Sequence, residues 1–310
     1  MDIWRSLKEH YNNDELMFKV NTGTKFVCIS LFFLILALGF TIVMVKIDLN
    51  YFNSKGVPGA IEFEDAFFDF IYQSITSSWP LLLLILVTIF MVGYYIAIIM
   101  MRPFKTIARF CEEQLSEHSM QYSADLFSDL KLLTSFTSFF FARIEEAKIR
   151  GNFEKVEIPE GFTKIHKPIF EKNFFLNYIF VIIVFSLLAS IGILLLNFEI
   201  HEKVLLLGRQ VLHHSSSSSE VSIFLNNQFE VTKLVSEYLL GFHALIYCMF
   251  GFHLYSQVAT PAFAIFATMR SFLKGNVHNR IHLVGYSYLR NDCRKINKYL
   301  EFVQKTIVKK

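Results

Sequence analysis

Charged side chains are absent from four long apolar stretches of this 310-residue chain. The stretches cover residues 26–45, 81–101, 174–196 and about 238–258, and each reaches the ~20 residues that a helix needs to cross a bilayer. A protein that moves protons or ions through a membrane usually carries an ionisable group within its spans. The sequence therefore argues against a channel, pump or ion-driven motor formed by this chain alone.

Paired cysteines and catalytic motifs are also absent. Cys28 and Cys248 lie in apolar stretches, whereas Cys111 and Cys293 lie in segments expected in the reducing cytoplasm, so no disulfide framework is expected. The sequence has no phosphate-binding glycine loop, kinase signature, nucleophile–base set or zinc motif. We therefore expect no enzymatic activity, no cofactor and no bound metal.

Histidines are few within the apolar stretches. His243 and His253 stand ten residues apart in the fourth stretch, about 15 Å along a helix axis. Each could ligate a haem only with a histidine from another span, and the first three stretches contain none. A histidine that hydrogen-bonds between helices is the favoured interpretation. The pair His213-His214 precedes five serines, which favours a polar loop over a weak metal chelate.

The composition that is present is that of a membrane protein. Hydrophobic residues make up 53% of the chain, and mean hydropathy is +0.41. Four lysines and arginines precede the first stretch, eleven lie in 102–173 and ten follow residue 258, against two and three in the other two connecting segments. The positive-inside rule then places both termini in the cytoplasm, and we expect the protein in a bacterial inner membrane. The net charge of +3 favours contact with lipid headgroups and not with nucleic acid.

The two halves of the chain share one plan. Each half has an apolar stretch, an outside segment, a second apolar stretch and then a pair of cytoplasmic helices. Pro103 and Pro261 stand at the start of these pairs, where a proline costs no hydrogen bond because the first N–H groups of a helix are unpaired. The sequence predicts an all-α membrane protein with four transmembrane helices in two tandem repeats, each followed by a cytoplasmic helix pair.

The clearest pattern follows the fourth stretch. After Pro261, apolar residues recur at helical spacing, a glycine follows, and two apolar residues stand four apart: Ile265, Met269, Phe272, Gly275, Val277 and Ile281. The next helix has a heptad seam at Leu289, Cys293, Ile296, Leu300, Val303 and Ile307. A weaker copy in the first half lacks the glycine and has Pro103, Ile107 and Cys111, then Leu126, Leu130, Leu133, Thr137, Phe140 and Ile144. This pattern resembles the HAMP signal-relay module of bacterial receptors and kinases.

The resemblance implies a parallel four-helix bundle, assembled from two helix pairs, that carries small conformational changes away from the membrane. It implies a relay core of Pro261, Ile265, Met269, Phe272, Gly275, Val277, Ile281, Leu289, Ile296 and Leu300, with Pro103, Ile107, Leu130, Leu133 and Phe140 in the second copy. Gly275 would permit the turn out of the first helix, and Val277 and Ile281 would hold the connector on the bundle. The two pairs come either from one chain, as a pseudo-dimer, or from a homo-oligomer.

These patterns divide the chain into six parts: an N-terminal segment at 1–25, a transmembrane hairpin at 26–101, a degenerate HAMP-like pair at 102–150, a linker at 151–173, a second hairpin at 174–258 and a HAMP-like pair at 259–310. We expect a relay or adaptor that passes conformational change to another membrane or cytoplasmic protein. A structural subunit of a larger membrane machine, such as a flagellar motor or secretion complex, is the alternative. A transporter or haem carrier built on the repeat is a third.

Overall fold

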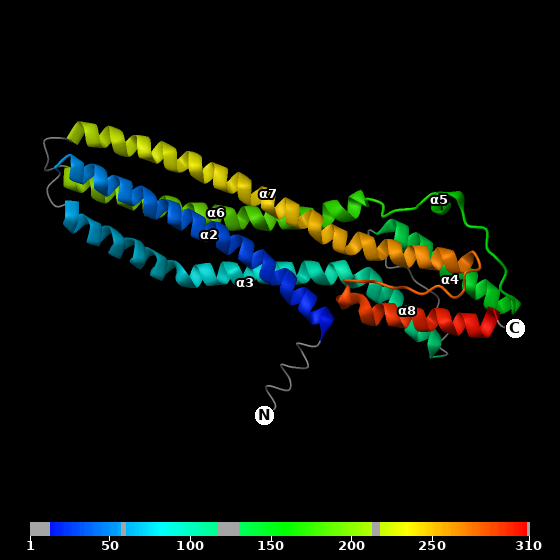
Figure 1. Ribbon diagram of the computed structural model, residues 1–310. Coiled ribbons are helices and arrows are strands. Elements are labelled where there is room, and N and C mark those ends of the chain that lie inside the picture. The colour runs from blue at the N-terminus through cyan, green and yellow to red at the C-terminus, as the bar shows by residue number, and fades with distance from the viewer. Residues whose placement is uncertain (1–12, 57–59, 117–129, 213–217, 309–310) are drawn as a thin grey trace, which may run out of the picture. The chain divides into compact units, whose positions relative to one another are not determined.

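The computed structural model describes residues 13–56, 60–116, 130–212 and 218–308. Regular secondary structure in these ranges is helical throughout (Figure 1): α2 (Asp14–Ser54), α3 (Ala60–Leu115), α4 (Lys131–Arg150), α5 (Glu160–Thr163), α6 (Lys172–Leu212), α7 (Ser218–Leu273), a 3-10 turn (Ser287–Leu289), α8 (Arg290–Val303) and a π turn (Gln304–Val308). Four helices, α2, α3, α6 and α7, are long and apolar enough to cross a membrane. The predicted all-helical class and the four apolar helices are confirmed, and they indicate a multi-pass membrane protein.

The chain folds into two compact units, each assembled from segments far apart in sequence. Unit 1 comprises Met1–Thr22, Tyr94–Phe180 and Phe250–Lys310, and unit 2 comprises Gly23–Gly93 and Val181–Met249. Each of the four long helices therefore contributes residues to both units. Unit 1 also contains all of α4, α5 and α8.

The prediction that Pro103 and Pro261 begin new helices is wrong. Helix α3 continues through Pro103 to Leu115, and α7 continues through Pro261 to Leu273. A proline inside a helix costs about 3 kcal/mol, because it removes one backbone hydrogen bond and crowds the preceding turn. Large apolar side chains one turn away, Ile107 and Ile265, are buried, and each contributes about 1.5–3 kcal/mol, which offsets this cost.

Helices also extend well into the segments expected outside the membrane. Helix α2 runs nine residues past the first apolar stretch to Ser54, and α3 begins at Ala60, well before the second apolar stretch. Val45, Leu49 and Ile71 form a buried cluster between these two ends. In the second outside segment, residues 204–212 belong to α6 and residues 221–235 to α7. The pair His213-His214 lies outside the described residues.

Unit 2 buries several polar side chains along with its apolar core and exposes many large apolar ones. Its buried polar residues include Ser30 and Thr41 on α2, Ser186 and Ser190 on α6, and Ser236 and His243 on α7. Its surface carries large apolar residues more than 60% exposed on all four helices: Ile35, Leu84, Leu195 and Met249. Such a surface would associate in water but suits lipid, where buried hydroxyl groups help to hold helices together.

Two glycines bring α2 and α3 close together in unit 2. A Cβ atom added to Gly93 would lie 2.6 Å from Cδ2 of Phe26 and 2.9 Å from the Cα of Gly23. A Cβ atom added to Gly23 would lie 2.9 Å from the carbonyl oxygen of Phe90. Small residues at a membrane helix crossing allow backbones to approach, so these glycines fix the packing of the first hairpin.

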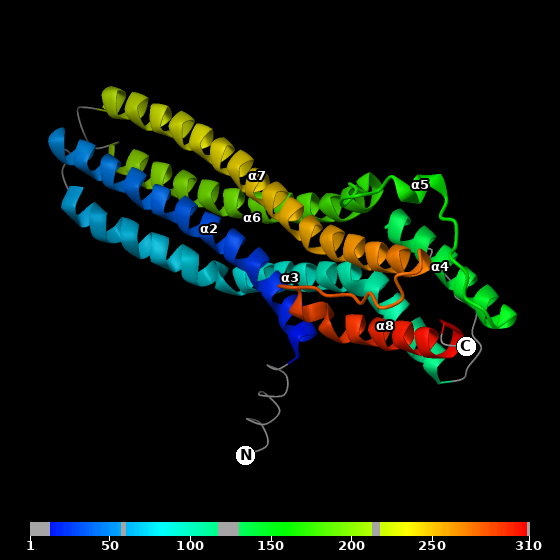
Figure 2. The same cartoon turned by 45° about the vertical axis from the view of Figure 1, so that its right-hand side comes forward.

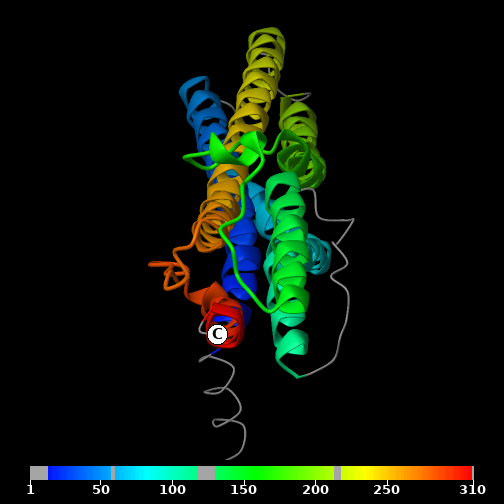
Figure 3. The same ribbon diagram turned by 90° about the vertical axis from the view of Figure 1, so that its right-hand side faces the viewer.

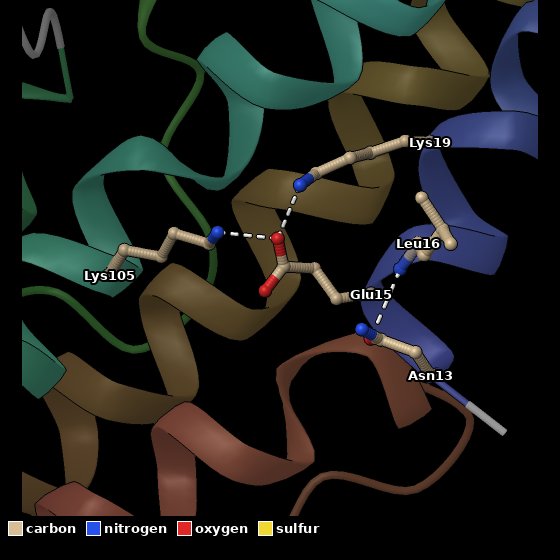
Figure 4. Close-up of polar contacts among 5 residues, drawn as sticks. All are labelled: Asn13, Glu15, Leu16, Lys19 and Lys105. Carbon is tan, nitrogen blue, oxygen red and sulfur yellow. Dashed lines mark hydrogen bonds and ion pairs between the residues drawn. The ribbon is translucent and has the colours of Figure 1, made fainter. Parts of the chain in front are cut away.

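In unit 1 the first turn of α2 is attached to the end of α3. The side-chain oxygen of Asn13 accepts a hydrogen bond from the backbone N–H of Leu16 at 3.3 Å, which caps the N-terminus of α2. The Glu15 carboxylate pairs with Lys19 of the same helix and with Lys105 of α3 (Figure 4). One acidic side chain therefore bridges two helices that are far apart in sequence.

Candidate functional site: the bundle core of unit 1

The residues predicted for the C-terminal relay core are buried in unit 1. Ile265, Met269, Phe272, Leu289, Ile296 and Leu300 are each 1% exposed or less. Pro261 is also buried, as are Val277 and Ile281 of the connector after α7. The seam residues Cys293, Val303 and Ile307 complete the apolar face of α8 and its π turn.

The residues predicted for the first copy lie in the same core. Pro103, Ile107, Leu130, Leu133 and Phe140 are buried, whereas Leu126 lies outside the described residues. Aromatic rings join the two sets: the ring centroids are 4.6 Å apart for Phe136–Phe266, 6.1 Å for Phe140–Phe272 and 5.7 Å for Phe141–Tyr299. The structure therefore packs α4 against the end of α7 and against α8, and each aromatic pair adds about 0.5–1.5 kcal/mol beyond the buried area.

Helix α8 also lies beside the end of α3 (Figure 2), where Lys295 pairs with Glu112 at 2.6 Å. Its N-terminal end contacts the start of α2: Arg290 lies 3.5 Å from Asp14, and the rings of Phe18 and Tyr288 stack with centroids 4.0 Å apart. These ion pairs are partly exposed and each is worth less than ~1 kcal/mol. They hold α8 in register but leave most of the stability to the apolar core.

Gly275 forms the turn that ends α7. Its backbone φ angle is +99°, a left-handed conformation that side chains with a Cβ atom rarely adopt. The N–H of Gly275 bonds to the carbonyl oxygen of Phe272 at 3.0 Å, and that of Asn276 bonds to Ser271 at 3.1 Å, the two hydrogen bonds of a Schellman motif. A Cβ atom here would also lie 3.0 Å from the Lys155 side chain.

The connector is held on α8 by polar side chains that sequence analysis did not select. The Asn297 side chain accepts a hydrogen bond from the Ile281 N–H at 2.8 Å and donates to the Ile281 carbonyl oxygen at 3.0 Å. Gln304 contacts Arg280 and lies 3.0 Å from Nδ1 of His278. An asparagine on a helix is a common surface residue, and its pairing with a backbone 16 residues earlier leaves no local signal in the sequence.

The segment predicted as a linker, 151–173, packs against the end of α7. It runs beside the end of α7 (Figure 3), where the Val156 N–H bonds to the Leu273 carbonyl oxygen at 3.1 Å. The Arg270 guanidinium donates to the carbonyl oxygens of Phe162 at 2.8 Å and Ile165 at 2.6 Å. Arg270 therefore provides hydrogen-bond donors for carbonyl oxygens at and after the C-terminal end of α5, and it attaches the segment to α7.

A second long-range contact caps α4. Because Leu130 provides no side-chain cap, the first N–H groups of α4 need another partner. The Glu171 carboxylate accepts from the backbone N–H of Leu132 at 2.7 Å and of Lys131 at 3.0 Å. The Tyr255 hydroxyl in turn lies 2.6 Å from the Glu171 N–H and donates to Ile169 at 3.0 Å. One network therefore joins α7, the entry to α6 and the start of α4.

Burial of the core also sets its ionisation. Desolvation raises the pKa of the Cys293 thiol to about 12, so this cysteine is neutral at physiological pH and packs as an apolar residue. Burial lowers the pKa of Lys148, whose ammonium lies 5.4 Å from the ring centroid of Tyr299. Desolvation raises the pKa of Asp292, and Glu15 raises it further. The Cys293 thiol is therefore not an activated nucleophile.

The two histidines of the fourth apolar stretch have separate environments. His243 is buried, and its Nδ1 hydrogen-bonds to Ser190 of α6, as expected for a histidine between helices. A cavity of about 20 Å³ lined by Ser190, Ser236 and His243 is large enough for one water molecule. His253 is exposed. Within the described ranges no three His, Cys, Asp or Glu residues are placed to hold a metal ion.

The unit defined by this geometry belongs to an all-helical protein with four helices that could cross a membrane. No family model matches the sequence, and comparison with curated proteins and with solved structures likewise finds no match. The functional argument therefore depends on the residues and contacts of this chain.

Proposed function

We propose that this chain is a membrane relay or adaptor protein that catalyses no reaction and passes a change in its long helices to a separate protein. The observation that carries the proposal is the composition of the unit 1 core. Helices α3 and α7, which also supply candidate spans, end in the core, and α4 and α8 pack against these ends. A rotation or shift of α3 or α7 would therefore change the packing of α4 and α8.

A HAMP-like organisation is part of this proposal. The end of α3 with α4 would form one helix pair, and the end of α7 with α8 the other, in an intramolecular pseudo-dimer. The aromatic contacts between the pairs, the left-handed Gly275 and the buried Val277 and Ile281 support it. A bacterial inner-membrane location with cytoplasmic termini belongs to the same proposal and is supported by the distribution of lysine and arginine.

The exposed face of α8 is the proposed output surface. Arg294 and Lys298 are exposed there, one helical turn apart. A groove of about 440 Å³ lies beside Arg294 and is lined by the connector and by Arg290, Arg294 and Asn297. Its basic rim fits an acidic segment of a partner, which charge complementarity would orient.

Affinity purification of the intact protein from its host in mild detergent, followed by quantitative mass spectrometry, tests the proposal. We expect a partner whose recovered amount falls at least tenfold for Arg294→Glu combined with Lys298→Glu. The same partner should be lost or altered for Gly275→Val, because a β-branched residue is strained at a φ of +99°. Gly161→Ala is the matched control, since a Cβ atom there meets nothing within 4 Å.

A structural subunit of a membrane machine predicts a different result. Components of one complex would then be recovered in a fixed ratio to this chain, unchanged by Gly275→Val in protein that unfolds at the wild-type temperature. That outcome would contradict the relay and leave the helices of unit 1 as static brackets.

A further inference from the structure

Unit 2 contains buried polar atoms that lack hydrogen-bond partners. Within the described ranges these atoms are both carboxylate oxygens of Asp48, Oε1 of Gln228, Oγ1 of Thr232 and Nε2 of His243. Asp48 and Thr232 are each 2% exposed or less, and Gln228 is 6% exposed. Buried polar groups in proteins are nearly always paired, so each exception requires an explanation.

Helices α2 and α7 run antiparallel in unit 2, and four side-chain contacts between them fix the register. Two of these contacts are polar: Lys55–Glu220, with nitrogen and oxygen 2.7 Å apart, and Ser30–Tyr247, with hydroxyl oxygens 2.7 Å apart. The other two join rings: the centroids are 3.9 Å apart for Tyr51–Phe224 and 4.4 Å apart for Phe33–His243. One turn before Tyr51 lies Asp48, and one turn after Phe224 lies Gln228. Asp48 and Gln228 therefore stand at the same level, with Thr232 one turn further along α7.

An ionised carboxylate in this position needs a compensating charge. Burying an unpaired carboxylate costs several kcal/mol even after relaxation, and Asp48 is flanked by the apolar cluster of Val45, Leu49 and Ile71. Among the side chains that the structure describes on the four helices in this region, the charged ones other than Asp48 are exposed: Lys46 on α2, Glu64, Asp65 and Asp69 on α3, Glu199, Glu202 and Lys203 on α6, and Glu220, Glu230 and Lys233 on α7. Lys55 pairs with Glu220. His243 lies 15 residues further along α7, about 22 Å away along the axis.

The unpaired atoms of Asp48 and Gln228, with that of Thr232 one turn further along α7, have the chemistry of a cation site. A carboxylate, an amide oxygen and a hydroxyl are hard oxygen ligands, which favour protons and hard metal cations over softer metals. One carboxylate carries one negative charge, so a monovalent cation neutralises the site, whereas a divalent ion would leave a buried positive charge. We propose that Asp48, Gln228 and Thr232 form a buried binding site for a monovalent cation, either a proton or Na⁺.

This site adds a buried ionisable group to helices whose apolar stretches contain no charged side chain. The first stretch ends at Val45, and Asp48 follows three residues later in the same helix. By its position in the sequence Asp48 belongs to a segment expected outside the membrane, where an aspartate is ordinary. Only the packing of α2 in unit 2 removes it from solvent, and the inference does not depend on the relay function proposed above.

Carbodiimide labelling of the purified full chain in lipid nanodiscs tests the site. Dicyclohexylcarbodiimide reacts with protonated carboxyl groups in apolar surroundings, and peptide mass spectrometry locates the label. In choline chloride we expect Asp48 to be labelled at least tenfold faster than the exposed Asp69. The rate should fall about tenfold per pH unit on the alkaline side of its titration. If the site binds Na⁺, exchanging choline for Na⁺ slows labelling at constant pH, whereas a site for protons alone responds only to pH.

Conservative variants separate the site from general damage to the fold. Asp48→Asn should abolish the label at this position while keeping or raising the unfolding temperature, since a neutral amide is less costly to bury. Gln228→Leu and Thr232→Val should shift the pH or Na⁺ dependence of Asp48 labelling, and Asp69→Asn should leave it unchanged. Labelling of Asp48 no faster than that of Asp69 at every pH and in both salts would overturn the proposal. An unchanged response in both Gln228→Leu and Thr232→Val would also overturn the three-residue site.

Discussion

Asn297→Ala should release the connector that follows α7 without unfolding the helix that carries Asn297. The wild-type side chain makes two hydrogen bonds to the backbone of Ile281, at 2.8 and 3.0 Å. Each is worth about 0.5–1.5 kcal/mol net, so their loss removes about 1–3 kcal/mol from the connector's attachment. The apolar contacts of Val277 and Ile281, which are 8% and 3% exposed, are unchanged.

Hydrogen exchange measured by mass spectrometry on the full chain in detergent resolves this change. A loss of 1–3 kcal/mol corresponds to exchange faster by about fivefold to 140-fold, because each 1.4 kcal/mol is a factor of ten in the opening equilibrium. The increase should be confined to amides of 276–286, and amides of α8 near Ile296 should exchange as in the wild type. Asn291→Ala is the matched control, since it removes the same side chain from an exposed position of the same helix.

Two results would refute the reasoning. Unchanged exchange across 276–286 would mean that apolar contacts alone hold the connector. Faster exchange throughout α8 would mean that Asn297 stabilises the helix and not the connector. Either result would mean that Asn297 does not couple α8 to the connector after α7.

Three further changes test other parts of the structure. Gly93→Leu should destabilise the first hairpin by at least ~1–3 kcal/mol in thermal unfolding, because its Cβ atom would lie 2.6 Å from the Phe26 side chain. Gly39→Ala is the control, since a Cβ atom there meets nothing within 4 Å. Equal unfolding temperatures for the two variants would contradict the close helix crossing. Glu171→Gln should cost about 0.5–2 kcal/mol and speed exchange at the first amides of α4, because a charged cap is lost, and unaltered exchange there would exclude the cap. Burial and Glu15 raise the pKa of Asp292, so the folded state favours its protonated form: stability falls as pH rises from the ordinary aspartate value of about 3.9 through the raised value. Asp292→Asn should flatten that part of the stability–pH profile, and a profile identical to the wild type would show that Asp292 does not titrate there.

The apolar stretches and the heptad seams were readable from the sequence because both are local patterns. A run of ~20 residues without charge has few alternatives to a membrane helix, and a 4-3-4-3 spacing puts its members on one helical face whatever packs there. Accordingly α2, α3, α6 and α7 contain the four stretches, and the described seam residues, from Leu130 to Ile144 and from Leu289 to Ile307, are buried. The prediction from the two prolines was wrong because the free-energy cost of a proline in a helix is offset by burial of apolar side chains around Pro103 and Pro261.

Long-range pairing was decided only by the tertiary structure. Glu171 caps a helix 39 residues earlier, Asn297 holds a backbone 16 residues earlier, and Asp48 is buried by packing in unit 2 against segments beyond residue 180. Each of these polar side chains is ordinary in its local sequence, and its role depends on which distant atoms surround it. The sequence by itself therefore determined which segments are helical and apolar, since those properties follow from neighbours in the chain. Which polar groups are paired, and which are buried without a partner, depends on contacts between distant segments, and only folding creates those contacts.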